Sequence, residues 1–209
     1  MPAASSSWVR AGSRGALAIV SGAAVGAVLE WSVPHLPFSL EPLANSAAPW
    51  LVLALAIALT TRRWAEAVVL AVTTLVALVA GFYVAEHLRG WPVSRHQVAL
   101  WTAASFAAGP LVGLSAAWLR GHGRTAAALG AGIVGGLLAG EAMHGIRQLQ
   151  FSTPHRYWHA QLVVGIAAAV ALPLWRSRHR LVASAPPLMT SLATCAVVGA
   201  GTYVAYQFP

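Results

Sequence analysis

The residues of this sequence that could carry chemistry are its few acidic side chains and its histidines. All five acidic residues are glutamates, and there are eight histidines. Glu30 follows the apolar run 16–29, and Glu141 lies inside the apolar stretch 137–143. A carboxyl group surrounded by apolar side chains can stay protonated at neutral pH and then act as a general acid. Glu30 and Glu141 are therefore our candidate catalytic carboxyls; the alternative is an ion pair with a nearby arginine.

Two short patterns place metal-ligand types at helical spacing. Glu141 and His144 are one helical turn apart, a spacing used by di-iron carboxylate bundles. His155 and His159 share one face if their segment is helical. The alternative is that these histidines lie at the membrane surface and bind loops and lipid headgroups. We expect no metal and no other cofactor, and we assign His144 to the catalytic group, where it can sharpen a neighbouring acid.

Aromatic residues supply candidate walls for a substrate pocket. Several tryptophans lie at the same ends of apolar runs as the glutamates and histidines, and aromatic faces stabilise cations. The alternative is an aromatic belt at the membrane interface, and for Glu86 an ion pair with Arg89, one turn away. The predicted substrate-binding residues are Trp31, Trp50, Trp101, Trp158, Tyr157 and Glu86.

The composition places these residues in a membrane protein. Of 209 residues, 58% are apolar and only 9% are charged, with a mean hydropathy of +0.68. Soluble domains carry about 25% charged residues, so an ordinary cytosolic globule and a disordered chain are excluded. A single cysteine, Cys195, excludes an intramolecular disulfide. Because the chain has no aspartate, an Asp-rich diphosphate–magnesium site is excluded as well.

The positioning elements are expected to be helices that cross the bilayer, since a spanning helix needs about 20 apolar residues. We predict an all-α, polytopic bundle that forms a single domain over residues 1–209. The second span is short and needs Ala47, Pro49 and Trp50 at the interface to reach across. The seven predicted spans are about 15–33, 48–61, 64–86, 97–119, 125–145, 160–175 and 188–207.

Arginine placement predicts the orientation. The net charge of +8 comes from arginines at the ends of apolar runs, which argues against nucleic-acid binding. With the N-terminus inside and the C-terminus outside, most arginines face the cytoplasm, as the positive-inside rule requires. Most glutamates and histidines then lie at the outer end. The predicted inner arginines are Arg10, Arg14, Arg62, Arg63, Arg120, Arg124, Arg176, Arg178 and Arg180.

Small residues and prolines shape the helices and the first outer loop. Gly22 and Gly26, like the Gly130–Gly136 segment, are expected to let helix backbones approach closely. The loop 34–49 carries four prolines and is expected to fold as an ordered lid over the bundle mouth. Asn45 and Ser46 are candidate caps for the second helix, and Pro49 suits its first turn.

Two resemblances follow from these features. The segments Pro42–Trp50, Gly140–Gly145 and Ser152–Trp158 resemble those of a family of small bacterial integral-membrane proteins of unknown function. The size, the helix number and the isolated glutamates resemble the membrane-bound terpene cyclases of meroterpenoid and indole-sesquiterpenoid pathways. That resemblance implies acid-initiated chemistry without metal, but it transfers no individual residue.

The leading functional hypothesis is proton-initiated cyclisation of a prenyl-type chain or its epoxide, in a multi-pass protein of a bacterial inner or plasma membrane. The lipophilic substrate would enter from the bilayer. A small proton-coupled transporter or a solute- or lipid-binding membrane protein is the alternative. A metal-dependent membrane enzyme using Glu141, His144, His155 and His159 is a third hypothesis.

Overall fold

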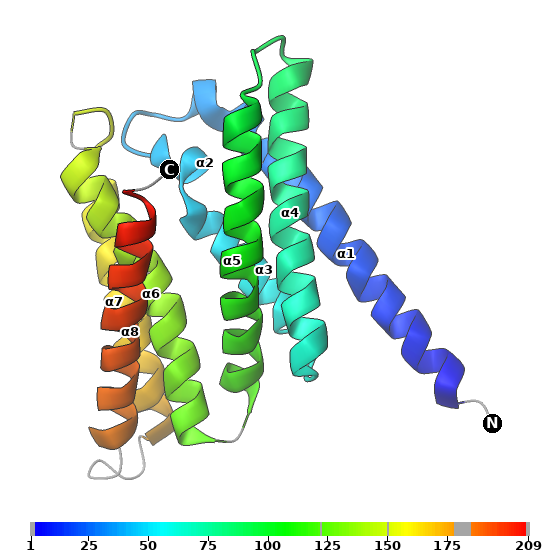
Figure 1. Cartoon of the computed structure of the whole chain (residues 1–209), viewed down its shortest axis with the longest axis vertical. Helices are drawn as coiled ribbons and strands as arrows, with labels where there is room; N and C mark the ends of the chain where they lie inside the picture. Colours follow the sequence, from blue (N-terminus) through cyan, green and yellow to red (C-terminus); the bar gives the residue numbers. More distant parts are fainter. Residues whose placement is uncertain (1–2, 122, 150, 178–184, 208–209) are drawn as a thin grey trace.

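The computed structural model describes residues 3–121, 123–149, 151–177 and 185–207, and these residues are helical nearly throughout (Figure 1). Arg178 and Arg180, which the orientation argument uses, lie outside the described residues, as do the side chains of Arg10 and Arg176. The helices are α1 (Ala3–Ser32), the 3-10 turn η1 (Val33–His35), α2 (Pro42–Asn45), α3 (Ala47–Ala58), α4 (Trp64–Leu88), α5 (Arg95–Arg120), α6 (Arg124–Gln148), α7 (His155–Ser177) and α8 (Ala185–Ala205).

Six helical segments in the described part of the chain are long and apolar enough to cross a membrane, so the protein is an all-α, multi-pass membrane protein. Five of them lie in α4 to α8, close to the predicted ranges, and the sixth covers Ala11–His35. The prediction for the second span is only partly met. Since α3 has 12 residues, it is about 18 Å long, too short for a hydrocarbon core of about 30 Å.

The long helices form two packed groups joined by α5 and α6 (Figure 1). In the first group α4 packs between α1 and α5, and α3 lies against α4 and α5. In the second group α6 packs against α7 and α8. As predicted, glycines allow these close approaches. A Cβ at Gly22 would meet the backbone of α4, and one at Gly136 would meet the backbone of α8 at 2.8 Å.

The two ends of the bundle differ in their polar contacts. At the end where α4 begins, which the arginines predict to be cytoplasmic, Arg14 donates to Glu66 at 2.9 Å. Thr61 donates to the other Glu66 oxygen at 2.6 Å, which fixes the short connection between α3 and α4. The opposite end, called here the predicted outer end, carries η1, α2 and the α4–α5 connection (Figure 1). The remaining glutamates lie toward that end.

The segment between α1 and α3 enters the bundle from the predicted outer end. Pro42, Ala44 and Ser46 are buried, and the backbone N–H of Ala47 reaches Glu141 of α6. Glu141 lies seven residues before α6 ends at Gln148, about 10 Å along the helix axis. The loop expected to cover the mouth therefore descends between the helices, and α3 begins at that depth.

Candidate functional site

A polar cavity of about 670 Å³ lies at the predicted outer end of the first helix group. The segment before α3 forms one side, and α4 and the start of α5 form the other. Its walls contain three carboxyl groups and one guanidinium group. The lining residues are Glu30, Val33, Pro34, Leu36, Glu41, Asn45, Trp50, Phe82, Tyr83, Glu86, Arg89, Trp91, Gln97 and Trp101.

Aromatic rings from three helices form one connected wall of this cavity. Trp50, in the first turns of α3, has its ring centroid 5.9 Å from Phe82 and 5.7 Å from Trp101. Phe82 meets Tyr83 edge-to-face at 5.4 Å. Because neighbouring rings restrain one another in such tilted contacts, this wall is built in advance of any ligand.

Glu30 is neutralised by an ion pair. It is 7% exposed, and Arg89 Nη1 donates to its carboxylate at 2.8 Å and to its backbone carbonyl at 2.9 Å. The guanidinium also lies 5.7 Å from the centre of the Trp31 ring and 5.6 Å from that of Trp91. Arg89 is the C-cap residue of α4, so this contact ties the end of α4 to the end of α1.

Glu86 and Trp50 carry polar atoms that lack partners. Within the described part of the chain, Glu86 Oε2 and Trp50 Nε1 are buried without a hydrogen-bond partner. Trp50 is only 6% exposed, and both residues line the cavity. A buried polar group without a partner costs about 1–3 kcal/mol. An acceptor and a donor without protein partners therefore belong to residues that line the same cavity.

Glu141 has a different role, since its two oxygens accept hydrogen bonds from separate segments. Oε1 accepts from the Ala47 backbone N–H at 2.5 Å and from Tyr206 at 3.4 Å, and Oε2 accepts from Gln161 Nε2 at 2.8 Å. Ser46 is the N-cap residue of α3 but makes no side-chain cap bond. A carboxylate stabilises the positive end of a helix dipole. Glu141 thus caps α3 from another helix, in place of the predicted Asn45 or Ser46.

The environment of His144 is aromatic. Its ring stacks on Tyr206 at 4.8 Å, and Nδ1 lies 3.3 Å from Gln207 Nε2. Burial and the nearby Glu141 carboxylate raise the pKa of Tyr206 well above its ordinary value. Tyr206 therefore stays protonated, and its hydroxyl donates a hydrogen bond to Glu141. Tyr206 also meets Trp101 edge-to-face, so it links the Glu141 group to the cavity wall.

Three predicted substrate-binding residues lie outside the cavity lining. Trp31 is 54% exposed and stacks with Arg89. Tyr157 shares a hydrogen bond of 2.5 Å with Ser46, and thereby holds the segment before α3. Trp158 is buried against Gly145 and donates to Thr153 at 2.7 Å.

The histidine pair expected from its spacing does share a helix face, because α7 begins at His155. The rings of His155 and His159 stack at 6.3 Å, and His159 Nδ1 lies 2.8 Å from the carbonyl of His155. Among the described residues, no group of three or more His, Cys, Asp or Glu side chains is arranged to hold a metal ion. Glu141 and His144 are instead engaged with the protein contacts given above.

The structure therefore divides the predicted site into two clusters. Glu30, Glu86, Trp50 and Trp101 line the cavity. Glu141 instead caps the start of α3, and His144 contacts Tyr206 and Gln207 beyond α8. Sequence reasoning missed Gln161 and Tyr206, which hydrogen-bond Glu141, and Tyr83 and Gln97, which line the cavity. Gln161 had a readable signal, since it is a polar side chain in an apolar span. Tyr206, Tyr83 and Gln97 have no such signal, because aromatic and polar residues are common near the ends of membrane-spanning helices.

Comparison with known proteins gives a family but no activity. Neither the curated proteins nor the solved structures contain a match to this chain. The comparisons thus lend no support to the resemblance to membrane-bound terpene cyclases. A family model described as "Family of unknown function (DUF6518)" matches residues 5–208. This match agrees with the resemblance to a membrane-protein family of unknown function. Because the match covers nearly the whole chain, the protein belongs to the DUF6518 family.

Proposed function

We propose that the protein is a solute-binding membrane protein whose cavity takes a small organic cation from the predicted outer side. The observation that carries this proposal is the pair of unpartnered buried atoms, Glu86 Oε2 and Trp50 Nε1, in one aromatic-walled cavity. A volume of about 670 Å³ lies within the range of about 300–1,000 Å³ typical of small-molecule sites.

The charges of the cavity favour a cation. Arg89 forms an ion pair with Glu30. The lining contains two further carboxyl groups, those of Glu41 and Glu86. With all four groups ionised, the lining carries an excess of negative charge. The faces of Trp50 and Trp101 attract a cation through their ring quadrupoles. An ammonium group between these rings and Glu86 is stabilised by both effects.

The unpartnered atoms narrow the ligand class further. The carboxylate of Glu86 needs a donor or a positive charge, whereas the indole N–H of Trp50 needs an acceptor. A ligand satisfies both when it carries a cationic nitrogen together with an oxygen acceptor. Small amino alcohols and their N-methylated derivatives have this combination, and we take choline as the probe.

Choline binding to the purified protein in detergent tests the proposal by isothermal titration calorimetry. The matched comparison ligand is 3,3-dimethylbutan-1-ol, which has nearly the same shape without the charge. We expect choline to bind at least tenfold more tightly than this neutral alcohol. Equal binding of the two ligands, or no binding of choline and related amines, would refute the cation site.

Two variants assign the interactions. Glu86→Gln should weaken choline binding about tenfold, because it removes the charge and keeps the shape. Glu66→Gln, at the opposite end of the bundle, is the control and should leave affinity unchanged. Trp50→Phe weakens the ring's attraction for both cations, but it should weaken choline, which carries a hydroxyl oxygen, more than tetramethylammonium, which has no acceptor. A Trp50→Phe effect of equal size on both ligands would contradict the role of the indole N–H.

The cyclase hypothesis stays a second proposal, favoured by the same aromatic wall beside a carboxyl group. Glu30 accepts from Arg89, and both oxygens of Glu141 accept from protein donors. Of the two remaining carboxyl groups of the lining, Glu41 and Glu86, it is Glu86, assigned from the sequence to substrate binding, that has a buried oxygen without a partner. We therefore propose Glu86 as the proton donor if the protein cyclises a polyene or an epoxide.

Expression with a prenylated precursor separates the two proposals. Mass spectrometry of the lipid extract should show a cyclised isomer for a cyclase, and Glu86→Gln should abolish it while the protein still inserts in the membrane. Unchanged precursor in the wild type, together with choline binding, supports the solute-binding protein. Full product formation by Glu86→Gln, Glu30→Gln and Glu141→Gln would reject acid initiation by these carboxyls.

A further inference from the structure

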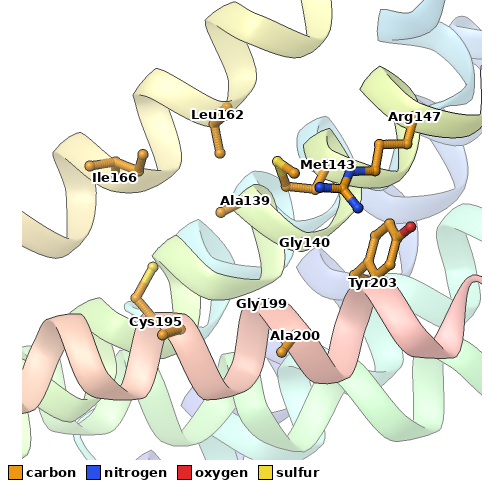
Figure 2. Close-up of a pocket in the computed structure, with 11 residues that line it drawn as sticks. Ala139, Gly140, Met143, Arg147, Leu162, Ile166, Cys195, Gly199, Ala200 and Tyr203 are labelled. Atoms are coloured by element: carbon orange, nitrogen blue, oxygen red, sulfur yellow. The ribbon is translucent and has the colours of Figure 1, made fainter. Parts of the chain in front are cut away.

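A second, apolar groove lies on the other helix group, between α6, α7 and α8 (Figure 2). Its volume is about 370 Å³. Ala139 lies on the α6 side, Leu162 and Ile166 on the α7 side, and Cys195 and Ala200 on the α8 side. None of these side chains belongs to the cation cavity, so the groove is a separate feature of the molecule.

The groove arises because α7 and α8 both pack on α6 but have few contacts with each other. Gly135 brings α6 onto α7, and Gly136 and Gly140 bring it onto α8. A strip of the α6 surface is therefore left uncovered between α7 and α8. From Ala139 to Arg147 this strip rises over eight residues, about 12 Å. That length matches an extended segment of an acyl chain. The strip also runs along the helix axes, as the acyl chains of a bilayer do.

One end of the groove carries a positive charge. Arg147 is exposed near the end of α6, and its guanidinium lies 5.9 Å from the centre of the Tyr203 ring. Figure 2 shows Arg147 and Tyr203 together at that end, beyond the apolar residues. No carboxylate of the described residues forms an ion pair with Arg147. The groove therefore combines an apolar trough with a guanidinium group near the end of α6 that has no carboxylate partner among the described residues.

We propose that this groove binds an anionic phospholipid of the surrounding bilayer, with one acyl chain along Ala139 and Ile166 and the phosphate at Arg147. Charge complementarity selects this occupant, because an apolar helix from a second copy would leave the guanidinium without an anion. Arginine suits a phosphate since its guanidinium presents several donors in a planar fork. Tyr203 lies next to Arg147 at the same end of the groove (Figure 2).

Native mass spectrometry of the detergent-purified full chain tests this proposal. Phosphatidylglycerol and phosphatidylcholine with identical acyl chains are the probes. We expect the wild type to retain phosphatidylglycerol about fivefold more strongly, the factor that one interfacial arginine gives toward anionic lipids. Arg147→Gln should abolish this preference. Arg95→Gln, an exposed arginine at the start of α5, is the matched control and should keep it.

Filling the groove tests the position of the acyl chain. Ala139→Phe should lower the retention of both lipids at least threefold, and Ala200→Phe, on the more exposed wall, should do the same if Ala139→Phe does not fold. Equal retention of the two lipids by the wild type would overturn the proposal, as would equal losses in Arg147→Gln and Arg95→Gln. A protein dimer that Ala200→Phe disrupts, with no lipid bound, would assign the groove to a second copy.

Discussion

Glu141 shows how one side chain can fix the position of a short helix, here α3. It is 4% exposed and accepts hydrogen bonds from α3, from Gln161 of α7 and from Tyr206 beyond α8. Within a membrane, backbone groups at a helix end have no water to bind. The carboxylate replaces water for the first turn of α3, and the same turn leads to Trp50 of the cavity wall.

The first prediction concerns this cap. Glu141→Ala should lower the free energy of unfolding by about 2–4 kcal/mol, because it leaves the Ala47 N–H and one N–H of the Gln161 amide unpaired at about 1–3 kcal/mol each. Glu141→Gln keeps one acceptor oxygen and should lose about half as much. Denaturant titration in detergent, followed by circular dichroism, measures both. Equal stability of the two variants would show that α3 starts without help from Glu141.

The second prediction concerns the ion pair between Glu30 and Arg89. Both side chains are largely buried, with 9% and 15% exposed. Removing one partner of such a pair leaves an uncompensated charge, at a cost of about 3–5 kcal/mol when burial is complete. Arg89→Met should therefore destabilise the protein by about 3 kcal/mol, and Glu30→Leu in the same chain should restore most of the loss. The same denaturant titration checks this. Additive losses in the double variant would contradict an ion pair of this kind.

Of the ion pairs that the sequence left open for Arg89, the structure shows the one with Glu30 and not the one with Glu86. Arg89 is one turn from Glu86, which predicts a local pair on the helix surface. However, Arg89 is the C-cap residue of α4, where the chain leaves the helix. Its side chain donates to Glu30 of α1 instead. The sequence identified the acidic residues of the outer end, but not which of them is neutralised. That distinction depends on packing between helices distant in the chain.

At the scale of elements, apolar runs bounded by arginine predicted the long helices well. α4, α5 and α6 begin within two residues of their predicted starts, because a charged or polar residue marks each membrane boundary. The short α3 was harder. Its apolar residues continue to Leu59, but the prolines before it and the buried polar cap decide that it starts inside the bundle. A polar cap on another helix leaves no local sequence signal.

The third prediction concerns the contact between α6 and α8. A Cβ at Gly136 would lie 2.8 Å from the Cys195 carbonyl oxygen and from Val198 Cβ, closer than real Cβ contacts. Gly136→Ala should therefore push α8 away and cost about 1–3 kcal/mol. Gly201 of α8 has nothing within 4 Å of such a Cβ. Gly201→Ala is the control, and it should be neutral or stabilise the helix by up to about 1 kcal/mol. Thermal unfolding in detergent compares the two, and equal melting temperatures would disprove the close approach.

At the scale of the whole molecule, each helix group carries one of the two candidate binding sites. The group of α1, α4 and α5 surrounds the polar cavity, and the group of α6, α7 and α8 carries the apolar groove. Glu141 of the second group holds α3, which packs in the first. The cavity and the Arg147 end of the groove lie toward the predicted outer end, so the side from which each is reached depends on the orientation of the chain in the membrane.

The fourth prediction is this orientation. The inner arginines predict that the α4–α5 connection faces the outside and that the α3–α4 connection faces the cytoplasm. The test uses a Cys195→Ala background, which removes the native thiol. Pro92→Cys then places a thiol in the α4–α5 connection, and Arg62→Cys places one in the α3–α4 connection. Both positions are exposed. A membrane-impermeant maleimide added to intact cells should label Pro92→Cys, and should label Arg62→Cys only after the membrane is opened. The reverse pattern would place the cavity on the cytoplasmic side, so its cation would then be bound from the cell interior. Equal labelling of both positions in opened cells controls for reactivity, because both thiols then meet the same reagent.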